Sequence, residues 1–241
     1  MKNRRRQPSE PPSECHCGPW TPAEICRRLR RVYGPIQPPP AEPVLDSLIR
    51  TVLSQHTSAA GCRAAWENLR RQFPTWQAVL RAPEAALVRV IRPAGLARQR
   101  AKTIQAILQH LHAHQGRLSL EFLHEWPTEK AWEYLLRFPG VGPKTAACVL
   151  LFGCGRPVLP VDTHVHRVAR RLGLIPPKCS AAKAQELLGL QVPARWVLEF
   201  HLQLIRHGRQ TCLARQPRCQ RCPLAAKCAF YENLVNLGGL Q

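Results

Sequence analysis

The chain has 241 residues, 45% of them hydrophobic, so it can bury one large or two small cores and is not disordered throughout. Thirty-five Lys and Arg residues against 15 Asp and Glu residues give a net charge of +20. Such an excess indicates a polyanionic partner, most often nucleic acid, with a merely solubilising surface as the alternative. No stretch is apolar enough for a membrane helix, and the basic start has no apolar segment behind it, which argues against a secretory signal.

The sequence predicts helices almost throughout. Residues 1–20 are charged and proline-rich and predict a flexible basic tail. Beyond the tail, apolar residues recur every three or four positions, as in helices with one buried face, and no convincing alternating strand is found. We therefore expect an all-α fold. The expected helices cover about residues 22–33, 45–53, 59–72, 83–91, 99–114, 128–137, 143–153, 163–172, 180–189 and 197–205.

The first chemical motif is a glycine hairpin between two expected helices. Gly140 and Gly142 allow a tight turn with an accessible backbone, and Pro143 suits the first turn of the helix that follows. Free backbone N–H groups at a helix start can bind a phosphate and contact a nucleic-acid backbone without reading its sequence. The pattern therefore predicts a helix-hairpin-helix site for nucleic acid.

Lys144 directly follows this hairpin, Asp162 lies 18 residues further along the chain, and each allows two interpretations. The Lys144 ammonium can bind a phosphate, or its amine can act as a nucleophile that forms a Schiff base. Asp162 can cap the helix that follows it. Its carboxylate can also stabilise positive charge as an N-glycosidic bond breaks, or help to move a proton. The residues alone leave these alternatives open.

The cysteines predict one metal site in a reducing compartment. Their number, 11, is odd, and the chain is too long for a small disulfide-stapled domain. Four of them fall near the C-terminus with the spacing Cys-x6-Cys-x2-Cys-x5-Cys. Four thiolates suit either a tetrahedral zinc ion or an iron–sulfur cube. The four residues are Cys212, Cys219, Cys222 and Cys228.

Together these motifs resemble the endonuclease III family of DNA glycosylases. The resemblance rests on Phe138-Pro-Gly-Val-Gly-Pro-Lys144, on Val161-Asp-Thr-His-Val-His-Arg167 and on the cysteine spacing, and covers roughly residues 22–230. It implies a two-lobed, all-α helix-hairpin-helix glycosylase fold with a C-terminal [4Fe-4S] loop.

The resemblance also implies how the lobes divide the chain. One lobe is expected from residues 46–156 and contains the hairpin and Lys144. The second combines residues 21–45 with residues 157–241, contains Asp162, and is closed by the iron–sulfur loop, whose ligands would be the four clustered cysteines. Bent DNA with one nucleotide flipped out would lie in the cleft between them.

The implied activity is base-excision repair of DNA. In the family the lysine after the hairpin attacks C1′ of a damaged nucleoside, the base leaves, and the Schiff base undergoes β-elimination. Lys144 and Asp162 occupy the matching positions. The resemblance implies oxidised or ring-saturated pyrimidines as substrates, double-stranded DNA with a damaged base as partner, no membrane, and a monomeric enzyme. Its expected location is cytoplasmic and nucleoid-associated in a bacterium, and nuclear or mitochondrial in a eukaryote.

Two loops are expected to probe the duplex. The family carries a glutamine that fills the gap left by an extruded base. An ungapped comparison places His56 at that position and Gln55 one residue earlier, so which of them fills the gap is open. The alternative is a plain loop capped by Ser58. Leu96 resembles an apolar wedge beside the lesion, with closure of its own turn as the alternative.

Three cations follow the wedge along one expected helix. Arg98, Arg100 and Lys102 could meet phosphates of the opposite strand or form a solvated helix face.

Two other functions remain as alternatives. One is a monofunctional glycosylase in which water attacks and Lys144 only binds phosphate. The other is a non-catalytic DNA-binding protein that uses the hairpin and a zinc site.

Overall fold

The computed structural model describes residues 19–236, and every regular element in this range is helical. The predicted all-α fold is confirmed. None of the described helices is long and apolar enough to cross a membrane. The first lobe contains α2 (Val44–Ser54), α3 (Ala59–Gln72), α4 (Trp76–Arg81), α5 (Glu84–Ile91), α6 (Ala97–Gln115) and α7 (Thr128–Leu136), and the second contains α1 (Pro22–Tyr33), α9 (Thr163–Arg171), α10 (Ala181–Gln191), α11 (Val197–Gln210) and α12 (Ala229–Asn236).

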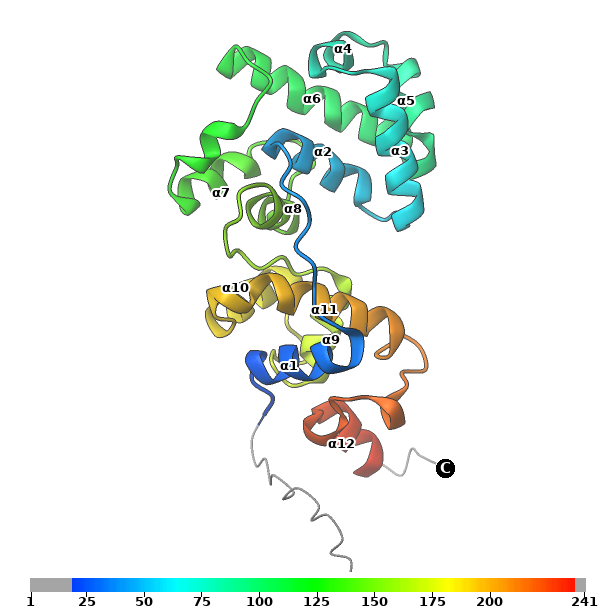
Figure 1. The fold of residues 1–241 in the computed structure, drawn as a ribbon, viewed down its shortest axis with the longest axis vertical. Helices are drawn as coiled ribbons and strands as arrows, with labels where there is room; N and C mark the ends of the chain where they lie inside the picture. The colour runs from blue at the N-terminus through cyan, green and yellow to red at the C-terminus, as the bar shows by residue number, and fades with distance from the viewer. Residues whose placement is uncertain (1–18, 237–241) are drawn as a thin grey trace, which may run out of the picture.

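Two separate hydrophobic cores lie on either side of one helix. That helix is α8 (Pro143–Cys148), which continues into a π-helical turn, η3 (Val149–Gly153), and it lies between the two lobes (Figure 1). Leu150 belongs to the first core and its neighbour Leu151 to the second. The helix after the hairpin therefore crosses the boundary between the lobes and is packed by both.

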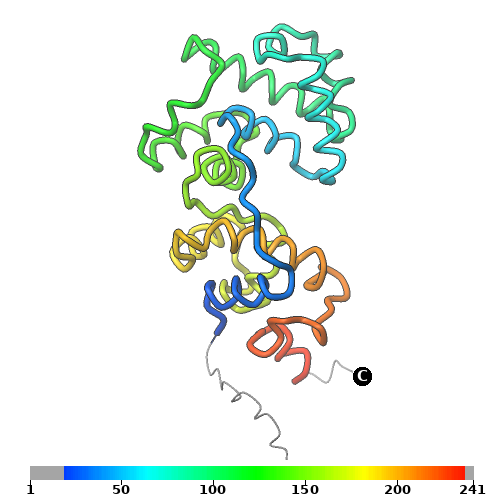
Figure 2. Tube along the Cα trace, viewed as in Figure 1, coloured from blue at the N-terminus to red at the C-terminus, as the bar shows by residue number. Residues whose placement is uncertain are grey.

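The chain changes lobes twice. The proline-rich segment of residues 34–43 runs from α1 in the second lobe to α2 in the first (Figure 2). Residues 154–162 lead back from η3 to α9. The second core accordingly joins apolar side chains of α1 to those of α9, α10 and α11.

Side-chain caps fix the starts of several helices, as polar residues before an apolar run predict. Thr21 and Glu24 form a reciprocal capping box at α1. Ser58 accepts a hydrogen bond from the Gly61 N–H at α3, which confirms the expected cap, and Asp162 caps α9 in the same way.

Only the last two residues of the predicted tail, Pro19 and Trp20, lie within the described range. Trp20 is packed into the fold. Residues 1–18 lie outside the described range. Trp20 is buried in the second core, and its indole Nε1 donates a hydrogen bond to the Leu224 carbonyl at 2.9 Å. The segment before α1 is thereby fastened to the loop that carries the clustered cysteines.

We expect Trp20→Phe to destabilise the protein by about 1–2 kcal/mol, because the ring still packs while the buried Leu224 carbonyl loses its donor. Urea unfolding measures this loss. Trp66→Phe is the control, since it makes the same change at a half-buried ring that packs against Trp76 and two guanidinium groups. Equal losses in the two variants would contradict a specific role for the Trp20 hydrogen bond.

Candidate active site and nucleic-acid interface

The glycine hairpin connects α7 to α8 and is held tightly against α6. Gly140 has φ +75°, and a Cβ there would lie 2.9 Å from Cγ2 of Thr103. The backbone conformation and the close approach both require glycine. Phe138 and Val141 are buried and anchor the hairpin, whereas Gly142 is exposed at the N-cap of α8. The first N–H groups of α8 have no partner within the helix, as a phosphate-binding helix start requires.

Lys144 and Asp162 are brought together from the two sides of the lobe boundary. Lys144 is half-buried in the first turn of α8, and Asp162 is half-buried at the start of α9. One carboxylate oxygen of Asp162, Oδ1, accepts a hydrogen bond from the Val165 N–H at 2.8 Å. The capping role of Asp162 is therefore real, and it leaves the second oxygen available.

Two buried groups, Cys148 and His201, lie within the electrostatic reach of both Lys144 and Asp162. Burial raises the pKa of the Cys148 thiol, and the nearby Lys144 ammonium opposes that shift. Burial lowers the pKa of His201 to about 4, which Asp162 opposes and Lys144 reinforces. The four side chains form one cluster, in which Lys144 and Asp162 are the only members that the sequence analysis singled out.

His201 fixes the segment that leads to Asp162. Its Nδ1 donates a hydrogen bond to the Pro160 carbonyl at 2.9 Å, two residues before the aspartate. The sequence analysis missed His201 because it lies on the apolar face of α11, with Val197 and Leu204. A histidine on a face that is otherwise apolar was the available signal.

Gln55 and His56 have different surroundings. Gln55 is half-buried, and its Nε2 donates to Oγ1 of Thr145 at 3.2 Å and to the Gly140 carbonyl at 3.4 Å. His56 is exposed and adopts φ +48°. Gln55 therefore supports the hairpin, and the exposed member of the pair is His56.

Leu96 lies close to this turn and is also strained and exposed. It adopts φ +46° and is 59% exposed. A hollow of about 300 Å³ is lined by residues from the two turns, α6 and the hairpin. The structure thus brings four of the expected DNA contacts, Gln55, His56, Leu96 and Gly140, to one hollow.

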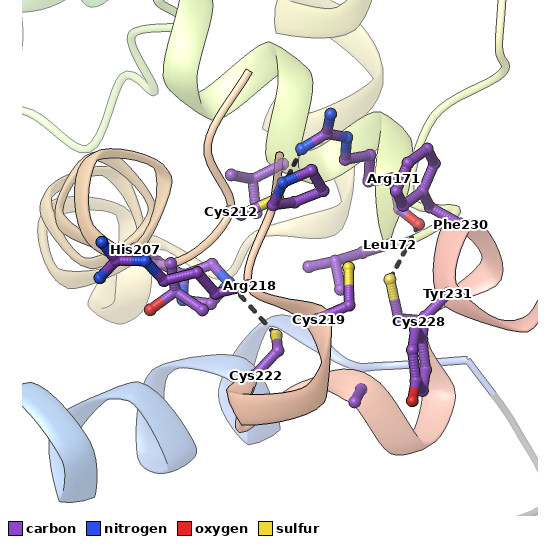
Figure 3. A pocket seen from close by; sticks show the side chains of 14 residues that line it. Arg171, Leu172, His207, Cys212, Arg218, Cys219, Cys222, Cys228, Phe230 and Tyr231 are labelled. Carbon is purple, nitrogen blue, oxygen red and sulfur yellow. Dashed lines mark hydrogen bonds between the residues drawn. The ribbon is translucent and has the colours of Figure 1, made fainter. Parts of the chain in front are cut away.

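The four clustered cysteines line one pocket in the second lobe (Figure 3). Cys212 Sγ lies 3.3 Å from Nη1 of Arg171, and Cys222 Sγ lies 3.4 Å from the Leu224 N–H and 3.6 Å from Nε2 of His207. N–H groups directed at sulfur stabilise thiolates. Among the described residues no three His, Cys, Asp or Glu side chains are close enough to hold a single metal ion.

Burial raises the pKa of three of these thiols. It raises the pKa of Cys222 to about 12 and raises the pKa values of Cys219 and Cys228. The loop itself is braced by Arg167, which donates to the Gly208 and Cys212 carbonyls at 2.8 and 3.0 Å. The exposed cations of this region are Arg209, Arg215, Arg218 and Arg221.

Comparison with known proteins shows to which family the chain belongs. The HhH-GPD superfamily of base excision DNA repair proteins matches residues 49–193, more than half of the chain. The chain is 30% identical over 217 residues to endonuclease III of Rickettsia conorii, which covers 88% of this chain and 99% of the relative. The identity to endonuclease III of Thermotoga maritima is 34% over 209 residues, covering 87% and 91%. The chain belongs to the endonuclease III family of DNA glycosylases.

Other relatives support the fold of this endonuclease III family member. A solved structure of a trapped covalent endonuclease III–DNA intermediate with an estranged adenine has a TM-score of 0.76 and 27% identity, covering 90% of this chain and 99% of that chain. A protein of Arabidopsis thaliana that is named as a DNA glycosylase is 37% identical over 168 residues, and this chain matches 57% of its length. The predicted helix-hairpin-helix glycosylase fold is confirmed.

His201 gives this endonuclease III relative an acid-sensitive core. Its pKa falls from 6.5 to about 4 on folding, so between these values the unfolded chain binds a proton that the folded chain does not. The folded state therefore keeps its full stability above pH 6.5, the pKa of the unfolded chain. Its free energy of unfolding decreases by roughly 2–3 kcal/mol as the pH falls towards 4, the pKa in the folded chain.

We expect His201→Asn, which keeps an amide donor near the Pro160 carbonyl without titrating, to flatten part of this pH dependence. Urea unfolding between about pH 7 and pH 4.5 measures it. His207, whose pKa is also lowered to about 4, keeps the rest of the acid sensitivity. His112→Asn is the control, because His112 is exposed. An unaltered profile in His201→Asn would show that this buried imidazole does not control acid unfolding.

Proposed function

We propose that this DNA glycosylase of base excision repair is bifunctional, with AP lyase activity, and that it removes oxidised or ring-saturated pyrimidines. The observation that carries the proposal is that Lys144, in the first turn of the helix that follows the hairpin, and Asp162, at the start of α9, both lie within electrostatic reach of the buried His201. A covalent endonuclease III–DNA intermediate has been trapped in a related structure, which supports an amine nucleophile. The preference for pyrimidines rests on the family resemblance.

In the proposed reaction the Lys144 nitrogen forms a bond to C1′ of the damaged nucleotide. The bond from C1′ to the base breaks, and the base leaves with the electron pair and takes up a proton. Ring opening of the sugar yields a Schiff base between Lys144 and C1′. Removal of a C2′ proton then expels the 3′ phosphate oxygen, which nicks the strand. Asp162 stabilises the positive charge that develops at C1′ and helps to transfer protons.

The two turns would hold the duplex open around the flipped nucleotide. We infer that His56 fills the gap in the base stack and that Leu96 acts as the wedge, because both side chains are exposed beside one hollow. Gln55 would act through the hairpin, to which it donates two hydrogen bonds. Gly140 and Gly142 would offer backbone N–H groups to a phosphate.

The cysteine pocket fits a [4Fe-4S] cluster. Cys212, Cys219, Cys222 and Cys228 line it from a single loop, and N–H donors already point at two of the sulfurs. When bound, the cluster would supply four iron–thiolate bonds and so brace the loop. The exposed arginines of the loop would then contact phosphates.

The proposal also covers the oligomeric state, the DNA partner and the location of the enzyme. We propose that the enzyme acts as a monomer on double-stranded DNA that contains a damaged base. It would work in the cytoplasm of a bacterium, associated with the nucleoid, or in the nucleus or mitochondrion of a eukaryote.

On a duplex with one thymine glycol, we expect Lys144→Gln to lower base release and nicking at least ~100-fold, because no other amine replaces the nucleophile. Asp162→Asn retains a good N-cap but removes the charge, so it should lower base release about 100-fold with little loss of stability. Gel analysis of strand nicking and chromatography of the released base measure both steps. Lys178→Gln, at an exposed lysine, is the control.

Other results would lead to the two alternative functions. Base release without nicking, unchanged in Lys144→Gln, would identify a monofunctional glycosylase that uses water. Tight DNA binding with neither product, across a panel of oxidised pyrimidines, would identify a binding protein and reject catalysis.

For the cofactor, we expect anaerobically purified protein to be brown and to contain about four iron and four sulfide per chain. Cys222→Ser should lower both contents, whereas Cys62→Ser, which lies outside the pocket, should not. Colourless protein with about one zinc per chain would contradict the cluster.

A further inference from the structure

Arg100 is a buried cation on α6 and does not face solvent as its neighbours do. It is 3% exposed, whereas Arg98 and Lys102 on the same helix are exposed. The expectation that all three cations contact phosphates or form a solvated face is therefore wrong for Arg100. Burial lowers its pKa, and no carboxylate among the described residues pairs with it. A buried charge without a counter-ion requires many hydrogen bonds to offset its desolvation.

The acceptors of the Arg100 guanidinium lie at two separate turns of the chain. Nη1 donates to the Leu53 carbonyl at 2.5 Å and to Oγ1 of Thr57 at 2.9 Å, and Nη2 donates to the Gln55 carbonyl. The Leu53 carbonyl lies in the last turn of α2, and Gln55 and Thr57 lie in the turn between α2 and α3. Nη1 also lies 2.7 Å from the Ala94 carbonyl, in the turn that precedes α6, so its two hydrogens are shared among three acceptors. One side chain therefore joins the two turns.

Each of these turns carries one strained residue with an exposed side chain. His56 lies in the first turn with φ +48°, and Leu96 lies in the second with φ +46°. Residues other than glycine adopt this left-handed conformation only where the surroundings impose it. Arg100 bonds to the residue immediately before His56 and to the residue two before Leu96. The hydroxyl of Thr57 also donates to the Ala94 carbonyl, which ties the turns directly.

We propose that Arg100 is a positioning residue that holds His56 and Leu96 at a fixed separation, so that both side chains enter a DNA duplex as one rigid unit. The inference rests on the proposed function, because it assigns a task to the two side chains that the function places in the duplex. Arg100 itself touches no DNA. It acts by fixing the backbone of both turns before the duplex arrives, so that neither turn has to be ordered during base extrusion.

The planar guanidinium is necessary for this role. Its donors form a rigid fork that reaches carbonyls in different directions, whereas a lysine ammonium is a compact charge at the end of a flexible stem. Arg100→Lys therefore preserves the charge and loses the simultaneous link between the turns. Arg89→Lys makes the same chemical change at an exposed position of α5 and serves as the matched control.

The test measures single-turnover base release from a thymine glycol duplex for the native enzyme and Arg100→Lys. Both are also measured in a His56→Ala/Leu96→Ala background. We expect Arg100→Lys to slow release at least ~10-fold in the native background, because small misplacements of this kind are costly. In the double-alanine background it should change the rate less than about 2-fold, since Arg100 acts only through the two side chains.

Two outcomes would overturn the proposal. One is an equal loss in both backgrounds, which would show that Arg100 supports the fold in general. The other is no loss in the native background. If Arg100→Lys does not fold, Thr57→Val removes one acceptor of the guanidinium together with the direct bond from Thr57 to the Ala94 carbonyl, and so weakens the same link between the turns. It should show the same dependence on background, with a loss of about 3-fold.

A second readout separates this inference from the proposed catalysis. A 2-aminopurine opposite a tetrahydrofuran abasic analogue reports insertion of protein side chains into the duplex without any reaction. We expect the native enzyme to change the fluorescence of the 2-aminopurine. At saturating protein, Arg100→Lys should change that fluorescence less than the native enzyme does. If the native enzyme releases no base and this difference persists, the catalytic proposal fails while the role of Arg100 stands. Identical fluorescence changes would reject that role.

Discussion

The burial of one helix in two hydrophobic cores determines where the candidate site lies. Leu150 and Leu151 are neighbours in sequence and pack into different lobes, so the segment formed by α8 and η3 cannot shift relative to either lobe without opening a core. Lys144 lies at the accessible start of this segment. The position of its amine is thus set by the burial of apolar side chains further along the same helix, and not by the conformation of a loop.

Asp162 reaches the same place from the other direction. The segment from η3 to α9 is held at Pro160 by the buried imidazole of His201, and Asp162 is held by its own hydrogen bond to the start of α9. The capping role and the proposed chemical role of Asp162 are therefore compatible, since one oxygen serves each. Fixed dipoles and charges of this kind can favour a transition state without rearranging as the reaction proceeds.

Positive charge has two different uses in this chain. The net charge of +20 correctly indicates a nucleic-acid partner, but part of it is not available at the surface. Arg100 and Arg167 direct their donors at backbone carbonyls of turns and of the cysteine loop. Sequence composition cannot separate these structural cations from those that contact phosphates, because burial depends on the packing of distant segments.

The sequence predicts the helices that have long apolar patterns and clear caps. The expected helices at residues 22–33 and 59–72 match α1 and α3. Two short helices, α4 and α12, were not predicted. The six residues of α4 offer too few apolar positions for a periodic pattern.

The candidate site was predictable only in part. Local motifs identify Lys144, Asp162 and the four cysteines. They do not identify His201 or Arg100, whose roles arise from contacts with residues 41 and 47 positions away. They also do not decide between Gln55 and His56, because that choice depends on a left-handed backbone turn.

Borohydride trapping tests the central claim most directly. The native enzyme would be mixed with a thymine glycol duplex and reduced, and the cross-linked peptide would be located by mass spectrometry. A stable protein–DNA adduct attached through the Lys144 nitrogen is the predicted result. An adduct on a different residue, or base release without any adduct, would contradict the assignment of Lys144 as the nucleophile.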